Sequence, residues 1–376
     1  MKKYIMIFLI IISAQFIVTF IILGQNKFGK LPSGERLARV EASPNYKNGK
    51  FHNLNFTPEL TEGYSMWRVL KETIFTKKIN QKPNEVPSVK VDLKALEPEE
   101  NILIWLGHSS YFLQADGKKI LIDPVLSGHA SPFSFSIKAF KGSDPYTYED
   151  IPEIDYLFIT HDHWDHLDYK SMMALKPKLK KIICGLGVGS HFEHWNFNND
   201  IIFETDWNDS IILDKGFVSH TTPSRHFSGR GFSRNKTLWV SFVLKTPTLN
   251  LFFGGDSGYD THFAEIGKKF GSFDIALLEN GQYDKAWRYI HMHPNEVLKA
   301  GSDLKTKGVL PGHSGKFDLA NHEWDEPLNT ISNLYNNEDF NLITPIIGEV
   351  VHLNSSAKKY NRWWKNEDEK LAASNK

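Results

Sequence analysis

One short run constrains this chain more than any other feature. Residues 161–166 read His-Asp-His-Trp-Asp-His and follow directly on the apolar stretch Tyr156–Thr160. Such a run cannot form part of a core strand, because burying so many polar groups without partners carries a large free-energy cost. Imidazole and carboxylate are ligands that zinc and similar divalent metals prefer. The run therefore predicts a metal-binding loop at the end of a strand, and the alternative is an unusually polar surface turn.

The spacing within the run indicates two ions rather than one. His161 and His163 alternate, so an extended segment can direct both rings at the same ion. Asp165 and His166 follow after one further residue, where a turn can present a second pair of ligands to a neighbouring ion. Two ions about 3.5–4 Å apart can share one hydroxide, as in other two-metal hydrolytic sites.

Composition bounds the class of protein. The chain has 376 residues, of which 41% are hydrophobic, so it can bury a large core in one large or two small domains. Lys plus Arg equals Asp plus Glu at 44 each, so no overall basic field attracts nucleic acid, and we expect no nucleic-acid partner. Cys184 is the only cysteine, which excludes an intrachain disulfide and a cysteine-dependent zinc site. It lies in an apolar strand-like stretch and is interpreted as a small buried residue.

The N-terminus is physically distinct from the rest. Tyr4–Leu23 carries no charge and is long enough to cross a bilayer. A cleavage site with small residues is hard to find near Gly24, which favours an uncleaved anchor over a removed signal peptide for residues 1–24. Lysines flank the span on both sides and hardly discriminate its orientation. The short N-terminal tail makes a cytoplasmic N-terminus and an exported globular part the expectation.

The remaining chain divides into three parts. Residues 25–100 are rich in proline and are predicted to be a wrapping or linker segment, with one helical pattern at Gly63–Lys78. Residues 101–355 form the predicted catalytic domain, and residues 356–376 a polar C-terminal tail. Strands are predicted at Ile102–Leu106, Tyr111–Gln114, Lys119–Ile122, Tyr156–Ile159, Lys181–Cys184, Ile201–Glu204, Ser210–Leu213, Phe217–His220, Leu238–Lys245 and Asn250–Phe253, and helices at Tyr169–Leu175, Thr261–Lys269, His293–Leu304 and Pro327–Tyr335. Hairpins come first and strands then alternate with helices, which predicts an α/β fold of two mixed sheets packed face to face with helices outside.

Three further ligand candidates follow apolar stretches. His226, Asp256 and His313 each lie just past a strand-like segment, where α/β proteins place their sites. Each signal is weak by itself, because a single loop histidine is more often solvated than bound to metal. Together with the run at 161–166 they supply enough ligands for two ions.

These residues carry a resemblance to a known family. Thr160–Asp168 matches the signature of the metallo-β-lactamase superfamily, and His226, Asp256 and His313 fall in the order that this superfamily uses. More narrowly, the chain resembles the branch of N-acylphosphatidylethanolamine-hydrolysing phospholipase D. The matching segments include Trp105–Ser110, Leu121–Val125, Ala130–Pro132, Phe252–Tyr259, Glu265–Gly267, Phe270–Asp274 and Phe317–Asn321. The resemblance spans about residues 36–353 and implies the αββα sandwich of the superfamily.

The resemblance also implies roles for the residues. His161, His163 and His226 would hold one Zn²⁺ ion; Asp165, His166 and His313 would hold a second, with Asp256 bridging the two. Mn²⁺ or Fe²⁺ could occupy the same ligands. A hydroxide between the metals would attack phosphorus, because two cations lower the pKa of bound water. Asp165 and Asp256 would thus serve catalysis as ligands. His291 would act on the leaving group or substrate; the alternative is a surface histidine at a helix start.

Residues around these ligands are assigned with alternatives. Asp123 is expected to accept the free N–H of a ligand imidazole, or else to cap the turn before Pro124. His108 is expected to line the same face, and Tyr283 and Trp287 precede His291 as candidate pocket residues. The chain departs from the branch at His293, where an acidic residue is expected, and after His313, where an aromatic residue is common. No role is assigned to His129, His191, His194, His220, His262 or His322.

The function implied is a zinc-dependent hydrolase that cleaves a phosphodiester bond, foremost by phospholipase D-type hydrolysis of N-acylphosphatidylethanolamine or a related phospholipid at a membrane. Two alternatives stay open. One is a hydrolase of a small lactone, ester or cyclic phosphate, because a fold does not fix its substrate. The other is a non-enzymatic, membrane-anchored protein that binds metal or lipid. A homodimer is a further option. The aromatic residues Phe133, Phe135, Phe140, Tyr146 and Tyr148 either meet the lipid interface or pack under a long loop.

Overall fold

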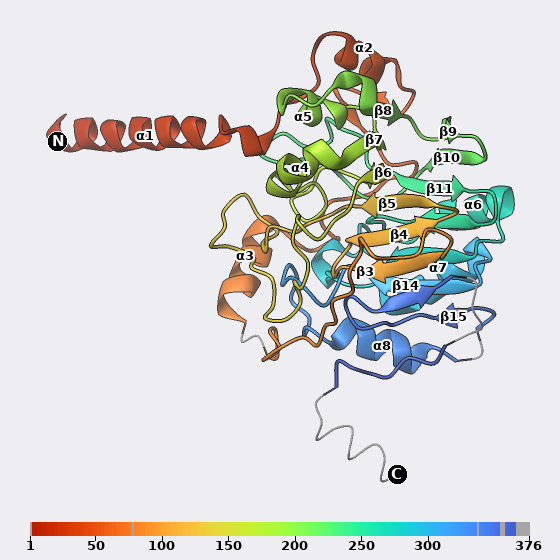
Figure 1. Ribbon diagram of the computed structural model, residues 1–376. Helices are drawn as coiled ribbons and strands as arrows, with labels where there is room; N and C mark the ends of the chain where they lie inside the picture. The colour runs from red at the N-terminus through yellow and green to blue at the C-terminus, as the bar shows by residue number, and fades with distance from the viewer. Residues whose placement is uncertain (1, 77–78, 337, 354–357, 366–376) are drawn as a thin grey trace.

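Two seven-stranded mixed sheets form the body of the protein (Figure 1). The computed structural model describes residues 2–76, 79–336, 338–353 and 358–365. The first sheet contains, in spatial order, β16 (Val350–His352), β3 (Ile102–Trp105), β4 (Tyr111–Ala115), β5 (Lys118–Ile122), β6 (Ile154–Ile159), β7 (Leu179–Gly185) and β8 (Ile202–Thr205). The second contains β15 (Asn341–Leu342), β14 (Gly308–Gly312), β13 (Ile275–Glu279), β12 (Asn250–Phe253), β11 (Ser241–Lys245), β10 (Phe217–Thr222) and β9 (Ser210–Asp214).

Alternation along the strands explains why the sheets stack. Successive side chains of a strand point to opposite faces, so in β3 Leu103 and Trp105 join the core shared with Phe253 of the second sheet, whereas Ile102 and Ile104 join the cluster on the outer face. Both faces of the strand are therefore apolar, and helices must cover the outer one. This is the predicted sandwich of two mixed sheets with helices outside.

Each sheet has its own covering helices. The outer face of the first sheet packs with residues of α4 (Tyr169–Leu175) and α5 (Gly189–His194), including Met172 and Phe192. The second sheet packs with residues of α6 (His262–Phe270), α7 (Pro294–Leu304) and α8 (Glu326–Leu334), including Phe263 and Val297. Short 3-10 helices lie at Asn26–Phe28, Lys176–Lys178, Asn199–Ile201 and Lys285–Trp287.

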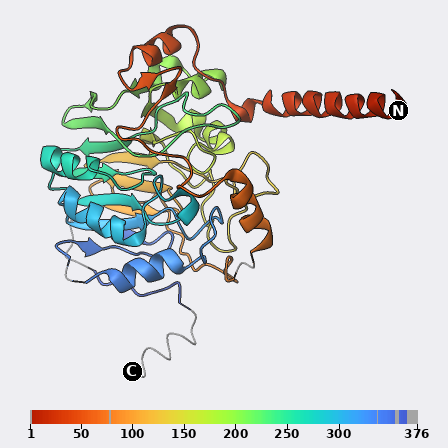
Figure 2. The same ribbon diagram turned by 180° about the vertical axis from the view of Figure 1, so that it is seen from behind.

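The N-terminal helix stands apart from this body. Helix α1 (Lys2–Leu23) projects away from the sheets in both views (Figures 1 and 2). Its stretch Lys3–Leu23 is long and apolar enough to cross a membrane, and none of the window that meets this test is buried. Length and composition are all that this finding rests on.

Residues 25–100 lie along the body of the two sheets and contribute Val40, Phe51, Val86 and Leu93 to its cores. The segment holds α2 (Gly34–Ala42), the small hairpin β1 (Tyr46–Lys47) and β2 (Lys50–Phe51), and α3 (Met66–Phe75). Helix α3 falls inside the predicted range Gly63–Lys78, whose last two residues lie outside the described chain. Helix α2 was not expected: it is short, and Val40 is its one buried residue.

Other differences from the sequence-based expectations are local. The strand predicted at Leu238–Lys245 begins only at Ser241, because Leu238 and Val240 instead bond across to Leu186 and Thr160. Trp363 and Trp364, within the predicted polar tail, are buried in the core between the sheets. Their indole N–H groups donate to Thr344 and Asn329. An aromatic pair of this size stabilises the fold when it is buried and its N–H groups are paired.

Candidate metal centre

The predicted ligands come from four segments that meet at one end of the sandwich. Loop 160–168 follows β6, and the segment with His226 follows β10. Asp256 comes after β12 and His313 directly after β14. The carboxyl ends of parallel strands meet at one sheet edge, which explains how residues distant in sequence converge here.

The first set consists of three imidazoles. His161 Nε2 lies 2.9 Å from His163 Nδ1, and His226 Nε2 lies 3.3 Å from that same atom. Three ring nitrogens this close can all face one ion, and they form one of the groupings in the described chain that could hold a metal. This is the set predicted for the first ion.

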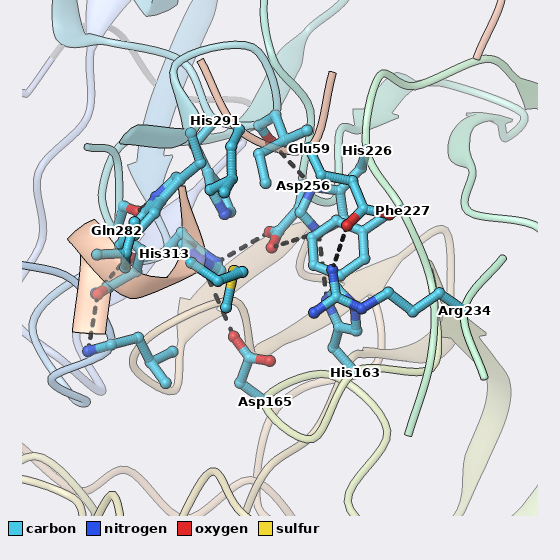
Figure 3. Close-up of a pocket in the computed structure, with 16 residues that line it drawn as sticks. Glu59, His163, Asp165, His226, Phe227, Arg234, Asp256, Gln282, His291 and His313 are labelled. Atoms are coloured by element: carbon cyan, nitrogen blue, oxygen red, sulfur yellow. Dashed lines mark hydrogen bonds and ion pairs between the residues drawn. The ribbon is translucent and has the colours of Figure 1, made fainter. Parts of the chain in front are cut away.

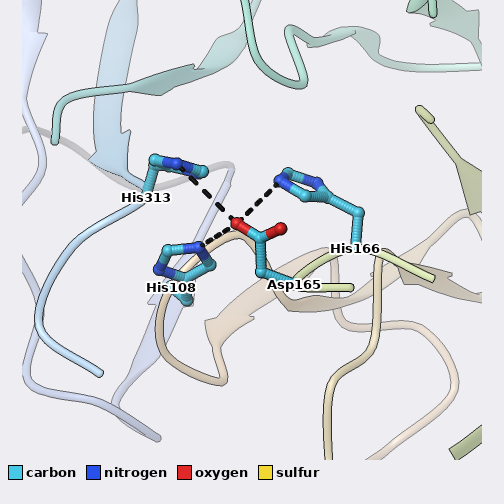
Figure 4. A group of neighbouring side chains, drawn as sticks. All are labelled: His108, Asp165, His166 and His313. Carbon is cyan, nitrogen blue, oxygen red and sulfur yellow. Dashed lines mark hydrogen bonds and ion pairs between the residues drawn. The ribbon is translucent and has the colours of Figure 1, made fainter. Parts of the chain in front are cut away.

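The second set combines a carboxylate with two imidazoles (Figure 4). Asp165 Oδ2 lies 3.6 Å from His166 Nε2 and 4.0 Å from His313 Nε2. His108 joins them, because its Nε2 lies 2.9 Å from the same oxygen. The structure therefore brings together the three ligands predicted for the second ion and places His108 beside them.

Asp256 lies between the two sets. Its Oδ2 is 3.2 Å from His166 Nε2, 3.7 Å from His226 Nε2 and 3.9 Å from His161 Nε2. Its Oδ1 is 2.9 Å from His313 Nδ1. One carboxylate thus touches ligands of both sets, as a bridging ligand must.

Two buried atoms test whether these residues fit metal ions. His166 Nε2 and Asp256 Oδ1 are buried, and neither has a hydrogen-bond partner in the described structure. Their close neighbours lie at the distances given above but outside hydrogen-bonding directions. Unpaired buried polar atoms are costly, and a cation at each set would bind them. The residues present therefore fit divalent metal ions.

Burial sets the protonation of the first set. Burial lowers the pKa of His163 to about 4, and it holds the pKa values of His161 and His226 well below the usual range of histidine. The rings are therefore neutral at physiological pH, which leaves a nitrogen lone pair on each for a metal.

The carboxyl groups of Asp165 and Asp256 are held in their charged form, unlike the imidazoles of the first set. Burial acts to raise the pKa values of Asp165 and Asp256, but the imidazoles around them, His166 first, outweigh it and hold both values low. Both side chains are therefore ionised. Two ionised carboxylates beside the neutral rings of the first set favour the binding of cations.

Side chains behind the second set fix its orientation. Asp123 Oδ2 lies 2.9 Å from His166 Nδ1, and its oxygens also accept from the backbone N–H and the hydroxyl of Thr160. Ser109 Oγ lies 2.8 Å from His313 Nδ1. The geometry places Asp123 where the carboxylate of a carboxylate–histidine–metal arrangement lies.

The backbone around this set is unusual. His108, Asp123 and His313 have φ values of 54°, 42° and 59°, in the left-handed region that non-glycine residues rarely adopt. His108 is fully buried, its ring centroid lies 4.2 Å from that of His313, and burial lowers its pKa to about 3. Left-handed residues of this kind cluster at functional sites.

His291 has a partner that the sequence analysis missed. Its Nδ1 lies 2.6 Å from Glu279 Oε2, and Glu279 Oε1 accepts the backbone N–H groups of Met292 and Ser257. Burial, with the nearby charge of Asp256, raises the pKa of Glu279 well above its usual range. Glu279 ends the apolar strand β13, so the rule that found Asp256 and His313 would have found it, had that strand been recognised.

A cavity of about 230 Å³ opens onto the centre (Figure 3). His163, Asp165, His226, Asp256, His291 and His313 line it. The remaining lining is largely apolar, with Leu60, Met66, Val69, Trp287, Ile290 and Leu319, and it also includes the ion pair of Arg234 with Glu59. The predicted pocket residue Trp287 is therefore in place.

Tyr283, the other predicted pocket residue, does not line this cavity. It borders an adjacent one with His293, and its hydroxyl donates to Glu326 at 3.0 Å. Its ring lies against His293, with centroids 4.8 Å apart. The side chain of Tyr283 therefore points toward α8 rather than toward the predicted metal ligands.

Three further residues hold the ligand segments and carried no signal in the sequence. His191, to which no role was assigned, bonds Asp162 of the ligand loop at 3.1 Å. The buried guanidinium of Arg230 donates to the carbonyls of Asp162 and Leu167 at the two ends of that loop. Asn53 bonds both backbone groups of His226. These contacts join segments far apart in the chain, so local sequence could not reveal them.

The fold and this site define a metal-dependent hydrolase. Residues 118–314 match the family described as the Beta-lactamase superfamily domain, and the chain belongs to this superfamily. An uncharacterised protein of Mycobacterium tuberculosis is 34% identical over 330 residues, which cover 86% of this chain and 88% of that protein.

Two further likenesses agree with this assignment. N-acyl-phosphatidylethanolamine-hydrolyzing phospholipase D 1 of Caenorhabditis elegans is 27% identical over 336 residues, covering 81% of this chain and 91% of the relative. Among solved structures, a metallo hydrolase of Ignicoccus hospitalis superposes with a TM-score of 0.51 at 19% identity, covering 67% of this chain and 97% of the other. The structural likeness supports the fold.

Proposed function

We propose that this hydrolase is a zinc-dependent phosphodiesterase that cleaves N-acylphosphatidylethanolamine, or a related phospholipid, in the manner of a phospholipase D. The observation that carries the proposal is the pairing of the two ligand sets with a cavity that has an apolar wall. A polar floor and an apolar wall match a substrate with a phosphate at one end and acyl chains at the other. The similarity to the Caenorhabditis elegans enzyme supports the same class of substrate.

Each metal would have a defined set of ligands. His161, His163 and His226 would hold one Zn²⁺ ion, Asp165, His166 and His313 would hold the other, and Asp256 would contact both. When bound, the two ions lower the pKa of water and offset negative charge on phosphate oxygens. As ligands, Asp165 and Asp256 would serve catalysis by keeping the two Zn²⁺ ions in place.

His291 is the side chain placed to exchange a proton with the substrate. Its ring lines the cavity, and Glu279 holds its Nδ1, which leaves Nε2 for the substrate. Hydrolysis at phosphorus breaks the bond to the headgroup oxygen, and that oxygen needs a proton to leave as an alcohol. We assign the delivery of this proton to His291 and the orientation of its ring to Glu279.

The wall of the cavity includes residues of α3. Met66 and Val69 belong to α3, which lies on the same side of the body as α1 in both views (Figures 1 and 2). Trp67 and Phe75 of this helix are 80% and 78% exposed. We infer that α1 anchors the chain, that the catalytic domain lies on the extracytoplasmic side, and that substrate enters from the bilayer past α3. A homodimer is compatible with this arrangement.

The test uses the full-length chain in detergent, loaded with zinc, and H₂¹⁸O as solvent. Hydrolysis of N-acylphosphatidylethanolamine should give N-acylethanolamine and phosphatidic acid with one ¹⁸O atom in its phosphate, detected by mass spectrometry. Chelation should abolish the product. A parallel reaction with phosphatidylethanolamine shows whether hydrolysis requires the N-acyl chain.

Labelled product from a lactone or cyclic phosphate, with none from either lipid, would replace the proposal by the small-substrate alternative. His291→Asn should lower kcat by about 100-fold or more, within the range for loss of a general acid. Lys268→Gln, on the exposed face of α6, should not. Unchanged kcat in His291→Asn would remove His291 from the reaction.

A further inference from the structure

The ligand loop borders a second cavity as well as the metal centre. Trp164 and Asp168 of this loop line a cavity of about 260 Å³, whereas His163 and Asp165 line the one described above. None of the seven predicted metal ligands lines the second cavity. Lys27, which follows α1 closely in the chain, forms part of its wall.

Two lysines and one carboxylate line the second cavity, so its lining carries a net positive charge. Lys27 and Lys170 both line it, and neither forms an ion pair within the described residues. Partial burial lowers the pKa of Lys27, and the positive charge of Lys170 adds to this effect. Asp168 is already engaged, because its carboxylate accepts the N–H groups of Lys170 and Ser171 at the start of α4.

A buried imidazole points to a missing partner in the same cavity. His129 lines it and is only 7% exposed. Its Nδ1 donates to the carbonyl of Ser131 at 3.0 Å, while its Nε2 is buried and has no hydrogen-bond partner in the described structure. An unpaired buried polar atom carries a free-energy cost, so a ligand atom that bonds to this nitrogen would stabilise the site. Because Nδ1 donates to the carbonyl, Nε2 carries a hydrogen only in the imidazolium form, and an anionic oxygen beside it would stabilise that form.

The remaining wall is aromatic. Phe133 and Phe135 stack with centroids 5.5 Å apart, and Lys27 Nζ lies 4.8 Å from the centroid of Phe133. Phe135 is 77% exposed. The combination of ammonium groups with exposed aromatic rings suits a ligand that has an anionic group beside an apolar part. If α1 crosses a bilayer, Lys27 lies just beyond the end of the span, at the depth of the lipid headgroups.

We propose that this cavity binds a phosphate group, with the headgroup of an anionic phospholipid as its ligand. The lysines would contact the phosphate oxygens, His129 Nε2 would donate to one of them, and the two phenylalanines would lie against the glycerol and upper acyl chain. This lipid is not the substrate, because the metal ligands face the other cavity. The site would instead hold the ligand loop against the membrane surface.

Binding to the full-length, zinc-loaded protein in neutral detergent tests the proposal. Three probes are titrated by calorimetry: dihexanoyl phosphatidylglycerol, dihexanoyl phosphatidylcholine and inorganic phosphate. We expect the anionic lipid to bind more tightly than the other two. Lys27→Gln together with Lys170→Gln should weaken its binding about 25-fold, about fivefold for each lysine. The matched control, Lys268→Gln, should leave it unchanged.

Further variants separate this site from the metal centre and from a folding defect. In Asp256→Asn, which disables the metal centre, binding of the anionic lipid should persist. His129→Phe keeps a ring of similar size and should weaken binding about fivefold with the metal content and Tm unchanged. Loss of binding in Asp256→Asn with retention in the double lysine variant would assign the lipid to the metal centre and overturn the proposal. Inorganic phosphate binding as tightly as the lipid would overturn the headgroup assignment while supporting a phosphate site.

Discussion

The two ligand sets of the metal centre are supported in different ways. In the first set, the ring of His226 is held by the main chain, because its Nδ1 donates to the carbonyl of Ile290 at 2.9 Å. The side chain of Asn53 bonds the backbone groups of the same residue. In the second, the ligands are held by side chains: Asp123 contacts His166, and Ser109 contacts His313. Support through the main chain survives most substitutions, whereas support through a side chain is lost with that side chain.

The two halves of the centre are therefore sensitive to different substitutions. Each set takes two ligands from the loop 161–166 and one from a distant segment, so the two sets differ in the side chains that support their ligands. The second set needs the correct placement of several segments, because its supports reach it from the turns after β3 and β5. Substitutions of those supports should weaken the second ion and spare the first.

The largest effect should come from the residue common to both sets. Asp256→Ala removes the carboxylate that touches His166, His226 and His313, so both ions should bind more weakly and kcat should fall by about 100- to 1000-fold. Metal content measured by mass spectrometry and steady-state kinetics check this. Glu265→Gln, a surface carboxylate of α6, serves as the control. A variant that keeps two ions and full activity would contradict the bridging assignment.

Asp123→Asn should weaken the binding of the second ion and leave the binding of the first unchanged. It removes the anionic acceptor of His166 Nδ1, and loss of such a partner weakens metal affinity by about 10- to 100-fold. Titration with a chelator should then release one ion early and the other at its normal concentration. Thr160→Ser, which keeps the hydroxyl bonded to Asp123, should behave like the wild type. Simultaneous release of both ions would show that the halves are not independent.

Asn53→Ala should act on the first half. It removes the acceptor of the His226 backbone N–H and one acceptor of the Trp239 indole, so the free energy of unfolding should fall by about 1–3 kcal/mol. The first ion should bind a few-fold more weakly while the second is unaffected. Urea denaturation and the same chelator titration measure both quantities, with the exposed Asn55→Ala as the control. Preferential loss of the second ion would reverse the comparison.

Ser109→Ala should give the smallest change. It removes one hydrogen bond to His313, which corresponds to about 1 kcal/mol, or roughly fivefold in affinity for the second ion. Ser210→Ala, at an exposed position of β9, is the matched control. An effect as large as that of Asp123→Asn would mean that the hydroxyl supports more than one ligand.

Local patterns in the sequence predicted the sandwich and seven candidate ligands, and the structure brings these seven side chains together. The run 161–166 is dense enough to identify, and Asp256 and His313 each follow an apolar strand. Glu279 obeys the same rule and was missed because its strand was not recognised. Arg230 could not be found in this way, because its contacts with the ligand loop depend on tertiary packing.

The left-handed backbone at His108, Asp123 and His313 has a consequence for the metal-free enzyme. Each such residue is disfavoured by about 1–2 kcal/mol relative to an ordinary conformation, yet all three must hold it for the second set to assemble. Part of the affinity for the proposed second ion would therefore be used to keep three separate turns in this conformation. Chelation should let these turns relax together, so amide hydrogen exchange should quicken at three points distant in sequence while the strands between them stay protected.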